Sequence, residues 1–244
     1  MSAPSRPLPD GPAVMRQKWK NHLFLHWKWD QARLQAALPD GLTVDTFEGD
    51  AWLGIVPFFM CGVRPALLPP VPFLSNFLEL NVRTYVRDSA GNPGVWFFSL
   101  DCNQPVAVSV ARTFFHLPYF HSKMSAVQRD GMTEYHSRRK GAGRAAIYKF
   151  RGNAPAAPAS PGSLEEFLVE RYRLYADAGG RLFSGEVRHP PYRISPATVT
   201  EWCAGPLHLA GFDAENRPPD HALHSAGVDV RVYPLRRPVS PADA

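Results

Sequence analysis

The stretch ELNVRTYVR, residues 79–87, decides the fold, because polar and apolar side chains alternate along it. A period of two predicts a β-strand with two unlike faces. One face carries Glu79, Asn81, Arg83 and Tyr85, and the other carries Leu80, Val82, Thr84 and Val86. On an exterior strand the polar face meets solvent, whereas inside a closed barrel the same face lines a ligand cavity. The sequence leaves both interpretations open.

Strand patterns continue on both sides of this stretch. Alternation from Trp19 to Trp29 predicts a half-buried strand, and turn residues separate the further segments 42–47, 51–60, 95–101, 106–114, 122–129, 132–137, 143–151, 181–188, 194–202 and 228–233. Helices are predicted after Asp30 and from Ser163 to the glycines at 179–180. The proline-rich segment 63–73 is expected to be a surface loop or a lid. These patterns predict a mainly β closed barrel or double sheet with one or two peripheral helices.

Length and composition fit one folded domain. The chain has 244 residues, of which 45% are apolar and 20% charged. We expect a disordered proline-rich segment 1–14, a domain over 15–237 and a tail over 238–244. Prolines interrupt the apolar region 51–78, so no membrane helix is expected, and the N-terminal residues lack a signal-peptide pattern. With three widely spaced cysteines, these features predict a cytoplasmic protein without membrane association.

A net charge of +5 raises the question of nucleic acid. The basic residues are scattered, and the aromatic and basic interleaving at 18–29 is better explained by a half-buried strand. Nucleic acid is therefore not expected as a partner.

The segment ARTFFHLPYFH, residues 111–121, places basic and aromatic groups beside a proline. Buried cations need anionic partners, which neighbouring strands could supply; a buried ion-pair network is the alternative. The predicted catalytic residues are Glu79, Arg112, His116, Tyr119 and His121. The predicted ligand-binding residues are Asn81, Arg83, Trp96, Asp101 and Lys123.

The order LELNVRTYV, GVWFFSLD and ARTFFHLPYFH is similar to the central pattern of acetoacetate decarboxylases. A more extensive resemblance, over 15–237, is to the YqjF-like bacterial family of unknown function, related in fold to those enzymes; it rests on LFLHW, LPDGLTVDTFEGDAWLGIVPF, FHLPYFHSKM, HPPY and GVDVRVYPLRR. The resemblance implies an acetoacetate decarboxylase-like pocket. Where the decarboxylases carry a lysine pair, this chain has Tyr119 and Phe120, which cannot form a Schiff base. Lys123 is the one nearby lysine that could substitute.

Other chemistries have weaker support. His116 and His121 could form a metal site with Glu79 or Asp101, but no tight ligand motif supports it, and His221 and His224 are expected in a solvated loop. No nucleophile elbow or phosphate-binding loop is present.

We therefore predict a protein that binds a small organic molecule without metal or cofactor. It either performs acid/base chemistry on a carbonyl or carboxylate compound, as a lyase- or isomerase-like enzyme, or binds its ligand as a sensor without catalysis. A homo-oligomer is left open.

Overall fold

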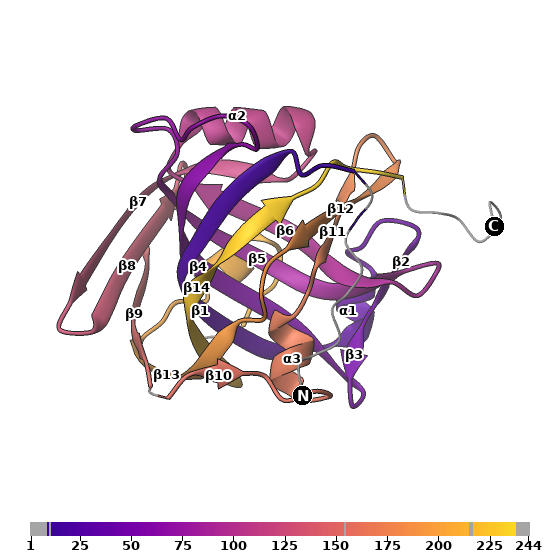
Figure 1. Ribbon diagram of the computed structural model, residues 1–244. Helices are drawn as coiled ribbons and strands as arrows, with labels where there is room; N and C mark the ends of the chain where they lie inside the picture. Colours follow the sequence, from indigo (N-terminus) through magenta and orange to yellow (C-terminus); the bar gives the residue numbers. More distant parts are fainter. Residues whose placement is uncertain (1–8, 10, 154, 215–216, 238–244) are drawn as a thin grey trace.

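The computed structural model describes residues 9, 11–153, 155–214 and 217–237, and it is mainly β, as predicted (Figure 1). The strands are β1 (Met15–Trp29), β2 (Leu42–Val44), β3 (Thr46–Phe47), β4 (Asp50–Pro65), β5 (Phe77–Asp88), β6 (Pro93–Cys102), β7 (Tyr119–Arg129), β8 (Met132–Arg139), β9 (Ala146–Gly152), β10 (Ala157–Pro158), β11 (Arg173–Asp177), β12 (Leu182–Arg188), β13 (Arg193–Glu201) and β14 (His221–Val232). The helices are α1 (Gln31–Gln35), α2 (Pro105–Phe114), α3 (Leu164–Val169) and α4 (Gly205–Leu209). Most of the segment 1–14, which was predicted to be disordered, and all of the predicted tail 238–244 lie outside the described residues.

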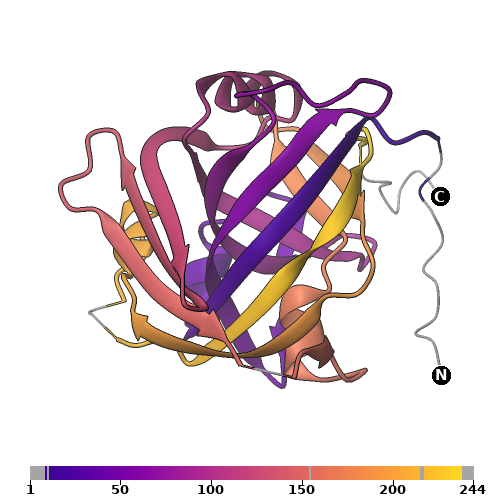
Figure 2. The ribbon, with the colours of Figure 1, turned by 60° about the vertical axis from the view of Figure 1, so that its left-hand side comes forward.

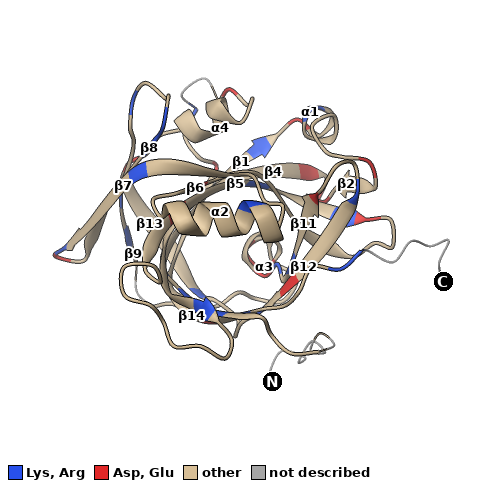
Figure 3. Ribbon diagram, turned by 90° about the horizontal axis from the view of Figure 1, so that it is seen from above, with Lys and Arg blue, Asp and Glu red and all other residues tan. Residues whose placement is uncertain are grey.

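Seven strands form a closed ring in the order β14, β1, β4, β5, β6, β11 and β12, with β12 pairing back to β14. The β6–β11 pair is parallel, and the other pairs in the ring are antiparallel. Helix α2 lies across one end of the ring, and α3 lies at the other end (Figures 1 and 3). The ring therefore encloses an interior that both helices help to cover.

A second layer of strands leaves the ring at β6 and returns to it at β14, through β7, β8, β9 and β13 (Figure 2). Side chains of this layer, including Tyr135, Tyr148 and Phe150, pack on the outer faces of β1, β4 and β5. These three strands are thus buried on both faces, which explains why their apolar runs are so long.

The prediction of a strand over 106–114 is wrong, because this segment is helix α2. Gln104 caps the helix by accepting a hydrogen bond from the N–H of Val106, and Pro105 occupies the first turn. The alternating valines suggested a strand. In the structure Val108 is buried while Val106 and Val110 are exposed, so the same residues divide between two helix faces.

The helix predicted from Ser163 begins there but ends at Val169. The Ser163 hydroxyl accepts a hydrogen bond from Glu166 N–H, as the capping pattern predicts. The chain then becomes extended, because residues Arg173–Asp177 pair with β6 and β12. Pairing into the sheet thus outweighs the helical spacing of Tyr172 and Tyr175, which predicted that the helix would continue.

The proline-rich loop after β4 lies at the surface, as expected. Leu67 and Phe73 are 96% and 91% exposed, so these side chains cover no cavity. Among the described residues, no helix has the length and apolar character needed to cross a bilayer.

Candidate functional site

The polar face of β5 points into the ring. Tyr85 belongs to the interior core, whereas Leu80 and Val82 belong to the core beneath the second layer. Glu79 and Asn81 are buried on the Tyr85 side of the strand. The polar face predicted from the sequence therefore lines the interior and does not meet solvent.

Glu79 and Tyr119 form a buried hydrogen-bonded pair. The Tyr119 hydroxyl donates to Oε2 of Glu79 over 2.6 Å, and the two residues come from β5 and β7. Burial raises the pKa of Glu79 to about 7, although the hydrogen bonds from Tyr119 and Asn81 favour the carboxylate. Burial, with the neighbouring Glu79, also raises the pKa of Tyr119 well above its usual value. The carboxyl group thus titrates near neutral pH while the phenol stays protonated.

Arg83 is a partly buried cation that has no carboxylate within 4.0 Å among the described residues. Its Nη2 donates to the carbonyl oxygen of Leu168 over 3.0 Å and to the Tyr85 hydroxyl over 3.4 Å. The guanidinium lies 5.6 Å from the centre of the Phe24 ring. Its charge is therefore hydrogen-bonded but not neutralised.

Three histidines extend this polar interior. His22 lies between the rings of Phe24 and Phe58, and burial lowers its pKa well below the usual value. His26 Nε2 lies 2.8 Å from the Tyr85 hydroxyl, and burial lowers the pKa of this ring as well. Burial likewise lowers the pKa of His189 to about 4. At neutral pH all three rings are therefore uncharged.

The hydrogen bonds fix the tautomers of two of these rings. The Tyr85 hydroxyl directs its hydrogen to the Leu168 carbonyl, so Nε2 of His26 is the donor and its Nδ1 is a free acceptor. Nδ1 of His189 donates to the Pro190 carbonyl over 2.8 Å, which leaves Nε2 as an acceptor.

Several buried polar atoms around the interior have no hydrogen-bond partner within the part of the chain that the structure describes. They are Nδ1 of His22, His26 and His221, Nε2 of His189, Oδ1 of Asn81, Nε of Arg83 and Nε1 of Trp52. Buried polar groups are normally satisfied by protein, water or a ligand, so a cluster of unsatisfied ones is unusual. Two hollows open at the molecular surface, and neither is lined by these residues. Among the described residues, the interior thus contains both unpaired donors and unpaired acceptors.

Four predicted site residues lie at the surface and not in the interior: Arg112, His116, His121 and Lys123. Arg112 is on the outer side of α2, whose helical geometry the strand prediction missed. His116 lies in the turn after α2 with a φ of 51°. The prediction that these four residues lie in the same interior as Glu79 and Tyr119 is therefore wrong, because all four are exposed.

Asp101 and Trp96 also point away from the interior. Asp101 pairs with Leu80 in the β5–β6 register, which places it on the outer face, where its Oδ1 accepts from Nε of Arg139 over 2.7 Å. Trp96 packs against a small cluster that contains Leu42 and Val86. Asp101 therefore belongs to a buried ion pair, the alternative that the sequence left open.

The considered metal combination is not assembled, because His116 and His121 are exposed while Glu79 and Asp101 lie on opposite faces. His221 and His224, expected in a solvated loop, lie on β14 and are partly buried. His221 is 5.8 Å from His26 between ring centres.

Sequence reasoning missed His22, His26 and His189 as members of the site. On β1 the even positions change from exposed Lys18 and Lys20 to buried histidines. This change from lysine to histidine was the available signal, because lysine is rarely buried. Nothing local in the sequence indicates that His189 reaches the same interior.

Lysine and cysteine side chains are further potential nucleophiles. All six lysines are described: five are exposed, and Lys149 forms surface ion pairs with Glu134 and Glu201. Cys102 lies in the interior core with its pKa raised to about 12 by burial, so its thiol is protonated.

The fold is that of acetoacetate decarboxylase-like proteins. The structure is similar to acetoacetate decarboxylase from Legionella pneumophila subsp. pneumophila str. Philadelphia 1, with a TM-score of 0.66 and 12% identity over 99% of this chain and 94% of the other. It is also similar to the enduracididine biosynthesis enzyme MppR complexed with pyruvate, with a TM-score of 0.62 and 13% identity over 93% of this chain and 91% of that one.

The chain belongs to the DUF2071 family, described as an uncharacterized conserved protein, whose model matches residues 16–229. It is 40% identical to the uncharacterized protein YqjF of Bacillus subtilis (strain 168) over 232 residues, which cover 94% of this chain and 95% of that protein. These findings confirm the resemblance on which the fold was predicted.

Proposed function

We propose that the ring interior binds a small, partly apolar molecule carrying a carboxylate group, and that the Glu79–Tyr119 pair performs acid/base chemistry on it. One observation carries the proposal: Arg83 brings a guanidinium to the inner face of β5 without a carboxylate partner among the described residues. Arg83 is partly buried, and an anion stabilises a cation that is partly withdrawn from water. The guanidinium fork suits a carboxylate, and Phe24 and Tyr85 beside it suit an apolar body.

The second half of the proposal concerns proton transfer. A general acid or base works best when its pKa lies near the working pH, and Glu79 meets this condition with a pKa of about 7. Glu79 and Arg83 are four positions apart on β5, so a ligand that contacts both groups is extended, on the order of 10 Å long. A sensor without catalysis would use Arg83 to recognise the ligand, and Glu79 would transfer no proton.

We further propose that the chemistry does not use a Schiff base. Iminium formation needs an amine at the reacting carbon. The side chains of Tyr119 and Phe120 have none, and the lysines lie at the surface. MppR has been obtained with pyruvate, which is a keto acid; the same class of ligand is compatible with Arg83 here.

Calorimetric titration with pyruvate and phenylpyruvate tests the binding step. Wild-type protein is expected to bind at least one of them, and Arg83→Met is expected to weaken binding tenfold or more, about 1.4 kcal/mol. Arg112→Met is the matched control, since it removes an exposed arginine from α2. Equal affinity in wild type and Arg83→Met would rule out the proposed anion site.

Deuterium exchange at the carbon next to the ketone of an extended keto acid, in which the ketone lies about 10 Å from the carboxylate, separates the enzyme from the sensor. An enzyme exchanges this hydrogen faster than buffer does, and Glu79→Gln abolishes the exchange while binding persists. Borohydride treatment with ligand is expected to give no covalent adduct; an adduct on Lys123 would contradict the mechanism.

A further inference from the structure

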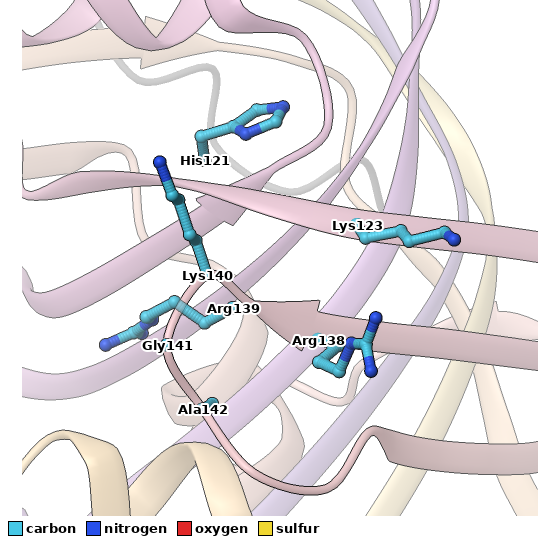
Figure 4. A pocket seen from close by; sticks show the side chains of 7 residues that line it. All are labelled: His121, Lys123, Arg138, Arg139, Lys140, Gly141 and Ala142. Atoms are coloured by element: carbon cyan, nitrogen blue, oxygen red, sulfur yellow. The ribbon is translucent and has the colours of Figure 1, made fainter.

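A hollow of about 460 Å³ lies on the surface at the paired ends of β7 and β8, outside the ring interior. Its lining includes His121, Lys123, Arg138, Arg139 and Lys140 (Figure 4). Two of these residues, His121 and Lys123, were predicted from the sequence to line the interior. The structure brings them together here instead.

The strand register gathers the basic side chains on one face. Lys123 lies directly opposite Arg138, and the N–H of Lys140 donates to the carbonyl of His121 over 3.4 Å. Alternation along each strand therefore puts these four side chains on the outer face, in two rows about 7 Å apart. In Figure 4, Lys123 and Arg138 extend side by side, and Lys140 reaches toward His121.

This arrangement has an energetic cost. Cβ atoms of directly opposed residues lie about 5 Å apart, and like charges at that separation destabilise a sheet. Within the described ranges, no carboxylate lies within 4.0 Å of Lys123, Arg138 or Lys140. Their mutual repulsion is therefore uncompensated within this part of the chain.

Arg139 also lines the hollow, but its side chain lies on the opposite face of β8 from Arg138 and Lys140. Its Nε binds Asp101 over 2.7 Å, its guanidinium lies 4.2 Å from the centre of the Phe120 ring, and its Nη2 is buried without a partner. The Asp101 carboxylate is thus engaged with Arg139. Among the described residues, the hollow keeps an excess of positive charge.

We propose that this hollow binds a compact polyanion, namely a diphosphate or triphosphate group, either free or attached to a small organic molecule. Its volume lies in the range of small-molecule sites. Lysine and arginine are the usual phosphate ligands, and the three cations Lys123, Arg138 and Lys140 suit linked phosphates better than a single one. Binding would also relieve the repulsion between Lys123 and Arg138. This site is independent of the ring interior and of the carboxylate ligand proposed there.

Calorimetric titration with inorganic triphosphate tests the proposal. Wild type is expected to bind saturably, with an affinity that falls as salt rises. The double variant Lys123→Ala/Arg138→Ala is expected to lose tenfold or more in affinity while unfolding at the same or a higher temperature. Lys20→Ala/Arg151→Ala removes the same two charge types from exposed positions outside the hollow and is expected to change affinity less than twofold.

Further titrations identify the kind of molecule that carries the phosphate groups. Tighter binding of a nucleoside triphosphate than of triphosphate assigns the group to a nucleotide, and equal binding assigns it to free polyphosphate; both support the site. No heat with wild type at about 1 mM triphosphate, or equal affinity in the Lys123→Ala/Arg138→Ala variant, overturns it. Binding only to oligonucleotides, with affinity that rises with their length, also overturns it.

Discussion

The two faces of the β5–β6 sheet treat buried charge in opposite ways. On the outer face, Asp101 and Arg139 form an ion pair 2.7 Å long. On the inner face, Glu79 and Arg83 are each hydrogen-bonded to neutral groups, and neither has an opposite charge within 4.0 Å among the described residues. The two faces belong to the same two strands, so strand geometry alone does not explain the difference.

The comparison suggests which charges serve the fold and which serve a ligand. Buried charges in proteins are usually paired, because an isolated one loses its hydration without compensation. The outer face follows this rule, and the inner face departs from it at Glu79 and at Arg83, whose charge acts on the unsatisfied His22 and His26. We infer that the outer pair is structural and that the inner groups are held for a bound molecule.

The largest expected effect comes from breaking the outer pair. Asp101→Ala leaves the Arg139 guanidinium without its carboxylate, and we expect the free energy of unfolding to fall by about 3–5 kcal/mol, measured by urea denaturation. Asp229→Ala, which removes an exposed carboxylate 3.9 Å from Lys18, is the control and should cost less than about 1 kcal/mol. Similar losses in both variants would contradict a structural role for the buried pair.

The next effect is the pH dependence that Glu79 produces on the inner face. The folded pKa of about 7 lies above the unfolded value of 4.5, so folding favours the protonated carboxyl, and its contribution falls as pH rises from 4.5 to 7. Glu79→Gln removes this dependence. Its free energy of unfolding should equal that of wild type near pH 4.5 and exceed it by about 3 kcal/mol at pH 8.

Glu134→Gln is the control for this pH series. The exposed Glu134 carboxyl has a lowered pKa because it hydrogen-bonds His136, so its contribution to stability is present above pH 4.5. That variant should therefore lose stability at pH 8, the opposite sign. If Glu79→Gln shows no gain between pH 5 and pH 8, the buried carboxyl does not titrate as described.

A smaller effect is expected for Arg83→Met. The substitution removes an uncompensated cation and its hydrogen bond to Leu168, two effects of opposite sign, so stability should change by no more than about 1 kcal/mol. Arg139→Met is the matched outer variant and should cost about 3 kcal/mol, because Asp101 is then left unpaired. Urea denaturation of both variants measures this difference in the free energy of unfolding. Equal losses of stability would contradict the expectation.

The smallest effect concerns the surface hollow. Lys123→Ala removes one of two like charges that lie directly opposite each other, so the free energy of unfolding should rise by about 0.2–0.5 kcal/mol in low salt. Added salt should abolish the gain, because screening weakens the same repulsion in wild type. A loss of stability in low salt would show that Lys123 is compensated.

The local sequence predicted the strands well where the two faces of a strand differ in polarity, as in β5 and β1. It failed for α2, because three alternating valines resemble a strand until packing shows which of them is buried. It also placed Glu79, Asn81, Arg83 and Tyr119 in the right interior. Arg112 was misplaced because its segment is a helix, and His116 and His121 because their direction depends on where the chain turns after α2. His189 comes from the connection between β12 and β13, far away in the sequence.

The nitrogen resonance of the Arg83 side chain tests the central claim most directly. In a ¹H–¹⁵N spectrum the Nε–H signal of Arg83 is identified by its absence in Arg83→Met. Titration with pyruvate or phenylpyruvate is predicted to shift that signal in a saturable manner while the Arg139 signal stays in place. If the Arg83 signal does not move while surface arginines do, the inner face of β5 does not bind the carboxylate, and the account of this site is wrong.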